Sequence, residues 1–400
     1  MPTNKEIFID YLGQTSPTPL MLEIEKAEGV KLYGPDGKNY IDLISGVSVS
    51  NTGHRHPEVI NAIKRQVDLY LHLMVYGEIV QTPQTEYAKA LIDLLPEKLE
   101  SVYFVNSGSE AIEGAMKLAK RYTGRHKIIS FIDGYHGGTH GALSLQGAET
   151  YKNSFRPLLP GTVQIRFNDF HSLNAIDSST ACVVVEPVQA EAGVILPKEG
   201  FLPALRKKCD ESGALLVFDE VQTGFGRLGE LFAIDKYDVV PDILVLAKAV
   251  GGGLPLGAFI SSREIMSALS FNPQLGHITT FGGHPVCCAA GLASLKVILD
   301  HGLTENCRLI SSIIKKRLIH PAITAIRGEG LLLAIELSNK DYVGYAVNHA
   351  PEHGLLIDYF LFNDKAFRIA PPLVMSVKEA EESCARVVDL LDKTVKDVII

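Results

Sequence analysis

ALLVFD at residues 214–219 and ILVLAK at residues 243–248 decide the fold expected for this chain, because each is an uninterrupted apolar run that ends in one charged residue. Runs without polar alternation predict strands that are covered on both faces, as in a parallel sheet between layers of helices. Further runs of this kind occur at 102–105, 127–131, 181–186 and 257–261. The sequence therefore predicts an α/β fold with a large, mostly parallel sheet and helices on both faces.

The pattern of apolar runs and turn residues divides the chain into three parts. In residues 30–44 the turn formers Pro35, Asp36 and Gly37 separate two mixed apolar runs, which predicts a hairpin. Helical spacing follows at 57–71, 84–96 and 109–122. Beyond about residue 290 the expected elements are a helix at 287–299, strands near 323–327 and 331–337, and a last helix from about 376. We expect an N-terminal segment (1–50) that packs with a smaller α+β domain (291–400), and a large domain (51–290) between them.

Composition favours a protein that acts on small molecules. The 400 residues are 46% hydrophobic and carry a formal net charge of −8 without long runs of lysine or arginine, which argues against nucleic acid or an anionic membrane as the main partner. The six cysteines include no CxxC motif, and the adjacent Cys287 and Cys288 would form a strained disulfide, so reduced thiols are expected. No apolar run approaches a membrane span, and the N-terminus lacks the features of a secretory signal. We expect a soluble, cytoplasmic protein.

Asp219 and Lys248 stand where two buried strands are expected to end, and together they suit pyridoxal phosphate. A partly buried lysine has a lowered pKa and readily forms a Schiff base with an aldehyde. A carboxylate beside the pyridine nitrogen raises the pKa of that nitrogen, and the ring acts as an electron sink only while the nitrogen is protonated. Taken alone, either residue is better explained as a paired structural charge. Other parts of the sequence have to decide between these roles.

A phosphate site is expected in VYFVNSGSEAIEGAMKLA (102–119), which runs from a strand into a helix. Ser107, Gly108 and Ser109 offer hydroxyls and free amides at the helix N-terminus, where the helix dipole favours an anion. Capping of the helix by Ser107 or Ser109, with Glu110 in its first turn, is the alternative role. Neither the dinucleotide motif GxGxxG nor the P-loop GxxxxGK[ST] is present, so nicotinamide and nucleotide cofactors are disfavoured.

Loops after two other apolar runs add candidates. Tyr135 lies in a glycine-rich loop, where its ring would stack on a pyridine ring or pack within the loop. Glu186 is a carboxylate at the strand edge where ligands bind in open parallel sheets, and it would contact the cofactor or accept a structural hydrogen bond. His136 and His140 are four residues apart, but the two glycines between them disfavour a helix and no HExxH glutamate is present. We therefore expect no metal site.

In sequence order, these segments resemble the class III aminotransferases, pyridoxal-phosphate enzymes that include ornithine, acetylornithine and 4-aminobutyrate aminotransferases. The resemblance covers nearly the whole chain and implies pyridoxal-phosphate fold type I, with a homodimer whose active site lies at the subunit interface. The motifs that carry it are GHRHPEV (53–59), NSGSEA (106–111), EPVQAEAGV (186–194), FDEVQTGFGR (218–227), LAKAVGGGLPLGA (246–258), TTFGGHP (279–285) and RIAPPL (368–373).

The resemblance implies a role for each matching residue. Lys248 would form the Schiff base and shuttle the proton, and Asp219 would hold the pyridine nitrogen. Arg368 would bind the α-carboxylate of glutamate or 2-oxoglutarate as a bidentate guanidinium, and Glu191 would pair with Arg368 when another substrate is bound. The remaining contacts implied are the phosphate cup of Ser107, Gly108 and Ser109, stacking Tyr135, Val221 on the other ring face, Gln222 at the ring hydroxyl, and Thr280 at the neighbouring subunit's phosphate.

Two departures concern the amine donor. Gly138 stands where the ornithine and acetylornithine enzymes carry an arginine for the donor's carboxylate, and Val47 stands where ornithine aminotransferase carries a substrate-binding tyrosine. Ornithine itself is therefore disfavoured, while the run GVSVSNTGH (46–54) looks closer to the acetylornithine branch. We expect a ping-pong aminotransferase that couples 2-oxoglutarate and glutamate to an acetylornithine-like ω-amino acid or amine.

Alternatives remain open from the sequence. A glutamate-1-semialdehyde-type aminomutase shares the cofactor residues but does not need Arg368. Another pyridoxal-phosphate enzyme, such as a decarboxylase or racemase, would need no keto acid. A non-enzymatic regulatory domain is disfavoured because both Lys248 and Asp219 are present.

Overall fold

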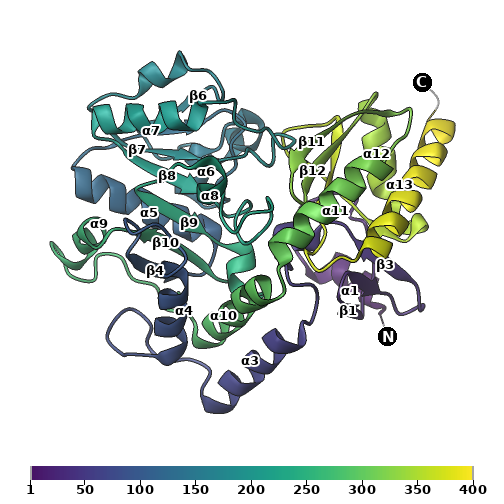
Figure 1. The fold of residues 1–400 in the computed structure, drawn as a ribbon, viewed down its shortest axis with the longest axis horizontal. Helices are drawn as coiled ribbons and strands as arrows, with labels where there is room; N and C mark the ends of the chain where they lie inside the picture. The colour runs from purple at the N-terminus through teal and green to yellow at the C-terminus, as the bar shows by residue number, and fades with distance from the viewer. Residues whose placement is uncertain (1, 399–400) are drawn as a thin grey trace.

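The seven-stranded sheet of the larger lobe positions the site. The computed structural model describes residues 2–398 and arranges them in two lobes (Figure 1). The sheet order is β4-β10-β9-β8-β7-β5-β6, and β10 alone among these strands runs against the direction of the others. The bounds are β4 (Ser101–Val105), β5 (Lys127–Phe131), β6 (Thr162–Ile165), β7 (Thr180–Val185), β8 (Leu215–Asp219), β9 (Ile243–Leu246) and β10 (Gly257–Ser261). The predicted mostly parallel sheet is confirmed.

Both faces of this sheet are covered, which explains why its strands are uninterrupted apolar runs. On β8, Leu215 and Val217 face a cluster that includes α5 (Gly108–Thr123), whereas Leu216 and Phe218 face a cluster that includes α7 (Phe201–Ser212). Successive strand residues point to opposite faces, so a strand between two helical layers has no polar side to present to water. The α/β layering predicted from the sequence is therefore confirmed.

The smaller lobe joins the two ends of the chain. β11 (Ile323–Glu329), β12 (Leu332–Leu337), β15 (Ala366–Ile369) and β14 (Asp358–Tyr359) form one antiparallel sheet. The N-terminal strands β1 (Lys26–Glu28), β2 (Lys31–Tyr33) and β3 (Asn39–Asp42) form another sheet with β13 (Leu355–Leu356), which pairs parallel with β3. Figure 1 shows this purple N-terminal segment beside the yellow C-terminal helix α13 (Val377–Asp397).

The antiparallel pairing of β2 and β3 confirms the hairpin predicted at residues 30–44. The exact division of the chain into 1–50, 51–290 and 291–400 stays a prediction. A long helix near the proposed boundary, α10 (Pro285–Asp300), packs against α3 (Pro57–Leu69) and α4 (Thr82–Ile92) of the larger lobe. The other α-helices are α1 (Asn4–Tyr11), α2 (Ser45–Ser48), α6 (His140–Leu145), α8 (Ala233–Tyr237), α9 (Arg263–Ser267), α11 (Leu303–Arg317) and α12 (Lys340–His349).

The cysteines and the longest apolar helices bear on two features of the whole chain. All six cysteines are buried and free, as predicted for reduced thiols. Within residues 2–398 no single helix is long and apolar enough to cross a membrane, and α10 and α11 meet that test only as a pair bent by 66°.

Candidate active site

A cavity of about 380 Å³ lies at the edge of the sheet where five strands end. The strands β4, β5, β7, β8 and β9 all point toward this edge, so the loops that follow them converge. Ligands of open α/β sheets bind at this edge, and the volume is within the range of about 300–1,000 Å³ for small-molecule sites. The lining includes nine of the twelve residues predicted from the sequence: Ser107, Gly108, Ser109, Tyr135, Glu186, Asp219, Val221, Gln222 and Lys248.

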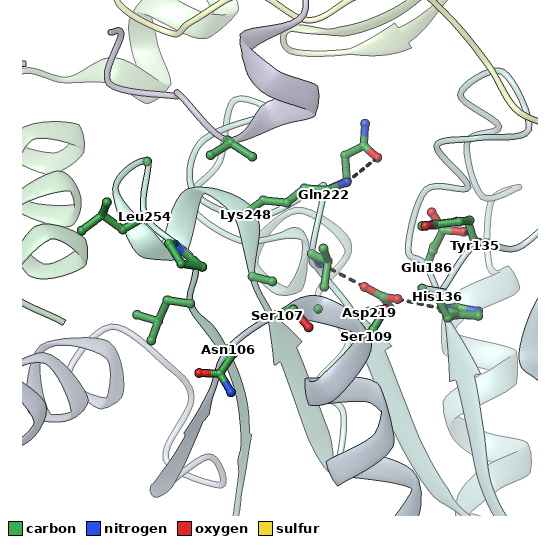
Figure 2. Close-up of a pocket in the computed structure, with 18 residues that line it drawn as sticks. Asn106, Ser107, Ser109, Tyr135, His136, Glu186, Asp219, Gln222, Lys248 and Leu254 are labelled. Carbon is green, nitrogen blue, oxygen red and sulfur yellow. Dashed lines mark hydrogen bonds and ion pairs between the residues drawn. The ribbon is translucent and has the colours of Figure 1, made fainter. Parts of the chain in front are cut away.

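Lys248 follows β9 and extends into the cavity. Its backbone is left-handed, with φ of 53°, an uncommon conformation for a residue with a side chain that is often found at functional sites. Nζ donates a hydrogen bond to Gln222 Oε1 over 3.0 Å, as Figure 2 shows. Burial lowers the pKa of Lys248 to about 8, although the charges of Glu191, Asp219 and Glu186 oppose that change. A neutral, nucleophilic amine is therefore available near neutral pH.

This lowered pKa predicts how the lysine titrates. We expect the rate at which the cofactor-free protein captures pyridoxal phosphate to rise with pH and to level off above about 8, because only the neutral amine attacks the aldehyde. Stopped-flow absorbance at several pH values measures this rate. A rate that still rises near the ordinary lysine value of 10.5 would contradict the assignment.

Asp219 ends β8 and is held by a histidine that the sequence analysis had considered only as a metal ligand. Asp219 Oδ2 lies 2.7 Å from His136 Nδ1, and Asp219 Oδ1 accepts a hydrogen bond from the Val221 amide. Figure 2 shows this dashed contact between the Asp219 carboxylate and the His136 ring. Burial lowers the pKa of His136, but the hydrogen bond and charge of Asp219 outweigh burial, so the pKa is raised overall. The buried histidine thus orients the carboxylate and stabilises its charge.

The N-terminus of α5 lies at one end of the cavity. Ser107 is the N-cap, and its hydroxyl accepts a hydrogen bond from the Glu110 amide, so the capping role is confirmed. Capping does not exclude anion binding, because the first amides of a helix lack acceptors within the helix. A Cβ on Gly108 would lie 3.1 Å from Val221 and 3.3 Å from Ala247, which explains a glycine where the strand ends pack closely.

Between Asp219 and the N-terminus of α5, the cavity wall carries groups that complement a substituted pyridine ring. Tyr135 is half-buried at one wall, and its amide donates to Glu186 Oε1 over 2.9 Å. Glu186 Oε2 also accepts from the Ala190 amide, and burial raises the pKa of Glu186 to about 7. Gln222 Nε2 is buried and has no hydrogen-bond partner among the described residues. An amide donor left free in this way fits a ring hydroxyl, so the cavity fits pyridoxal phosphate.

Three predicted residues do not line this cavity. Arg368 on β15 and Glu191 form a buried ion pair with 2.6 Å between Nη2 and Oε1, and the guanidinium lies 4.8 Å from the Phe360 ring centre. Both charges act on the pKa of Lys248, so the pair lies near this lysine. Thr280 is exposed on the loop before α10, and its contact with a neighbouring subunit stays a prediction.

Several cavity residues were missed by sequence reasoning. Val49 comes from the N-terminal segment, and no local signal linked it to a site more than 50 residues further along the chain. The segment Gly253–Leu256 leads into the antiparallel β10, whose first residue therefore lies at the same edge. The glycine run after Lys248 was the available signal, because glycine permits close approach of the backbone to a ligand. The others are Asn106, His136, Gly137 and Ala247.

A sheet edge that combines a lysine with a lowered pKa, a buried carboxylate held by histidine and a free helix N-terminus defines an enzyme that uses pyridoxal phosphate. Residues 12–391 match the aminotransferase class-III family. The chain therefore belongs to the class III aminotransferases, which are pyridoxal-phosphate-dependent transaminases acting on small amino and keto substrates.

Individual relatives are similar along almost their whole length. The chain is 39% identical over 388 residues to the acetylornithine aminotransferase of Methanopyrus kandleri. The aligned residues cover 96% of this chain and 97% of that protein. It is 39% identical over 387 residues to the putrescine aminotransferase of Pectobacterium atrosepticum, with 92% and 80% covered. The ornithine aminotransferase of Toxoplasma gondii, solved with partial occupancy of pyridoxal phosphate at its active site, superposes with a TM-score of 0.90 at 29% identity, covering 98% and 93%.

Proposed function

We propose that this enzyme transfers an amino group between an acetylornithine-like ω-amino acid or amine and 2-oxoglutarate by a ping-pong mechanism. The observation that carries the proposal is the buried Arg368–Glu191 pair beside Lys248. An arginine fork matches a carboxylate in two hydrogen bonds, and its pairing with glutamate leaves it neutralised when no substrate carboxylate is present. We further propose a cytoplasmic homodimer with Thr280 reaching the partner's phosphate site.

Each residue has a defined task in this proposal. Bound pyridoxal phosphate supplies an electron sink for the substrate carbon. Lys248 would hold the cofactor covalently in the resting enzyme, and once an incoming amine displaces Nζ, the freed amine would move the proton between the substrate carbon and the cofactor. Asp219, held by His136, keeps the ring nitrogen protonated. Ser107, Gly108 and Ser109 hold the phosphate, while Tyr135 and Val221 enclose the ring and Gln222 contacts its hydroxyl.

The Arg368–Glu191 pair explains how one site takes two unlike substrates in turn. Opening the pair frees the guanidinium for the α-carboxylate of glutamate or 2-oxoglutarate, whereas the closed pair presents no free cation to an ω-amino group. Arg368 Nε has no hydrogen-bond partner among the described residues, so the guanidinium retains an unused donor for an incoming carboxylate. A buried polar group left without a partner costs free energy, which binding of the carboxylate would recover.

A substrate panel tests the proposal. The purified protein is expected to show visible absorption that borohydride bleaches, with the label on Lys248. Acetylornithine, 4-aminobutyrate, lysine, β-alanine and simple amines are then offered with 2-oxoglutarate, and glutamate formation is measured. Glutamate formation excludes a strict aminomutase, whereas carbon dioxide release or racemisation without any keto acid would overturn the proposal.

Replacing Arg368 with alanine should separate the two half-reactions. We expect kcat/KM for 2-oxoglutarate to fall roughly 100-fold or more, because removing one partner of a buried charge pair costs about 2–5 kcal/mol. In the half-reaction with the amine donor, kcat/KM should fall less, since Arg368 is paired with Glu191 in that half-reaction. Single-turnover kinetics of each half measure the difference. Arg327→Ala, which removes another arginine paired with a glutamate in the same lobe, is the control. Equal losses in both halves would refute the assigned role.

Gly138 offers a test of the donor. Nothing lies within 4 Å of a Cβ built on Gly138, so an arginine side chain can begin at this position without a clash at its Cβ. We expect roughly a tenfold higher kcat/KM for acetylornithine in this variant, because a hydrogen bond to a charged group contributes about 1.5–3 kcal/mol. Gly138→Gln, of similar reach without the charge, should give no such gain. An equal gain from both variants would show that charge is not responsible.

A further inference from the structure

Arg227 is a buried cation that pairs with no carboxylate in the part of the chain that the structure describes. It is fully buried, and its guanidinium donates to four neutral oxygens: Ser45 Oγ, Asn51 Oδ1, Leu331 O and Pro371 O. Burial lowers the pKa of Arg227 to about 10. Burying a charge without a counter-ion is unfavourable unless hydrogen bonds compensate it. The four acceptors come from three distant segments, so the side chain links parts of the fold that are far apart in sequence.

One of these segments contains α2 (Ser45–Ser48), a strained left-handed turn beside the cavity. Ser45, Gly46, Val47 and Ser48 have φ of 50°, 62°, 61° and 64°, and a left-handed backbone is unfavourable for the β-branched Val47. The next residue, Val49, lines the cavity. A strained segment persists only where its surroundings hold it, and such strain is common at functional sites.

Two buried groups hold this turn. Asp42 Oδ1 accepts hydrogen bonds from the amides of Ile44 and Ser45, each over 2.8 Å. Arg227 donates to Ser45 Oγ over 3.1 Å and to the side chain of Asn51. Asp42 therefore holds the start of the turn, and Arg227 holds both its first residue, Ser45, and Asn51 just beyond its end.

The same arginine holds the segment that follows Arg368. Arg227 Nη1 donates to Pro371 O over 2.7 Å, three residues after Arg368. Ser45 Oγ, which accepts from Arg227, donates in turn to Ala370 O over 2.7 Å. The Leu373 amide donates to Asn51 O over 2.8 Å. The wall that carries Val49 and the segment after Arg368 are thus joined both by the guanidinium and by hydrogen bonds directly between them.

Arg227 also belongs to the loop that follows β8, which comes directly after Asp219 and contains Gln222. The guanidinium therefore connects this cofactor loop with the two segments that face the substrate. Its reach to all three needs a planar fork with several donors, which a lysine ammonium does not provide.

We propose that Arg227 is a positioning residue, which holds the turn bearing Val49 and the segment bearing Arg368 at a fixed separation and so sets the fit of the keto acid in the site. This inference rests on the proposed binding of 2-oxoglutarate by Arg368. Arg227 itself does not line the cavity, so it acts through the residues it holds.

Two variants test the proposal on the cofactor-loaded enzyme. Arg227→Met keeps the length of the side chain and removes its donors, while Ser45→Ala keeps the arginine and removes only the hydroxyl that joins it to Ala370. We expect KM for 2-oxoglutarate to rise about tenfold or more in Arg227→Met and about threefold in Ser45→Ala, because small misplacements of binding groups are costly. The visible absorption of the bound cofactor should stay unchanged, since neither residue contacts Lys248 or Asp219.

Hydrogen exchange provides a readout independent of activity. The amides of Ala370 and Leu373, which donate to Leu43 and Asn51, should exchange faster in both variants. Arg206→Met, which removes a partly buried arginine of α7 that is paired with Asp242, should lower stability without changing KM or this exchange.

The outcomes separate the inference from the proposed function. An unchanged KM in Ser45→Ala, or losses confined to melting temperature and cofactor content, would overturn the positioning role. If the wild-type enzyme does not accept 2-oxoglutarate, the proposed function fails and the exchange measurement decides alone: faster exchange at Ala370 and Leu373 supports the role, and unchanged exchange refutes it. If Arg227→Met does not fold, Ser45→Ala carries the test.

Discussion

The variant Lys248→Ala is expected to lower kcat by at least about 1,000-fold, because one side chain supplies both the covalent link to the cofactor and the proton transfer. Its Nζ is the amine whose pKa burial lowers to about 8. The variant should also lose the borohydride-sensitive visible absorption, even if it still binds the cofactor through the phosphate site. Single-turnover absorbance with L-glutamate measures the rate, and mass spectrometry after reduction locates the label.

Lys152→Ala is the matched control for this prediction. Lys152 is also buried, pairs with Glu149 and does not line the cavity. We expect its replacement to leave the visible absorption and the borohydride label in place. A Lys248→Ala enzyme that still formed a borohydride-stable link would remove the basis of the whole assignment.

The variant Asp219→Asn should have the second largest effect. Asparagine has a similar volume but no charge, so the ring nitrogen would lose the group that keeps it protonated. We expect kcat to fall roughly 100- to 1,000-fold, since each unit by which the pKa of the ring nitrogen falls lowers its protonated fraction about tenfold. The rate of substrate deprotonation, followed with deuterated L-glutamate, measures the effect directly.

The adjacent residue provides the control for this substitution. Glu220 is also buried, but its carboxylate accepts the amides of Ala233 and Ile234 at the start of α8 and does not line the cavity. Glu220→Gln should therefore lower the melting temperature and leave the proton-transfer rate close to wild type. If the proton-transfer rate fell no more in Asp219→Asn than in Glu220→Gln, the charge at position 219 would not be needed for the reaction.

Much of the larger lobe could be predicted because its strands are buried on both faces. The runs ending at Asp219 and Lys248 are apolar throughout, and this pattern has few structural explanations other than a covered strand. Strand direction carries no such signal. The run at 257–261 has the same composition as its neighbours, yet β10 is antiparallel, because direction depends on how the connecting segment crosses the sheet.

The candidate site could be predicted only where a chemical group is distinctive in sequence. Lysine and aspartate at strand ends are conspicuous, and the free helix N-terminus follows from NSGSEA. His136 was considered only as a metal ligand and rejected in that role, and its contact with Asp219 was not predicted because Asp219 lies 83 residues away. Arg227 gave no signal at all, since its four acceptors are ordinary backbone and side-chain oxygens brought together by folding.

The apolar runs thus determined the layered α/β architecture, and the motifs in their order determined the resemblance to a transaminase family. An apolar run and a motif are properties of short segments, so they can be read along the chain. The tertiary structure alone decided that His136 orients Asp219 and that Arg227 joins the N-terminal turn to the segment after Arg368, whereas the pairing of Glu191 with Arg368 was already implied by the family resemblance. Hydrogen bonds and ion pairs depend on distances of about 3 Å between segments far apart in sequence, and only the folded chain specifies those distances.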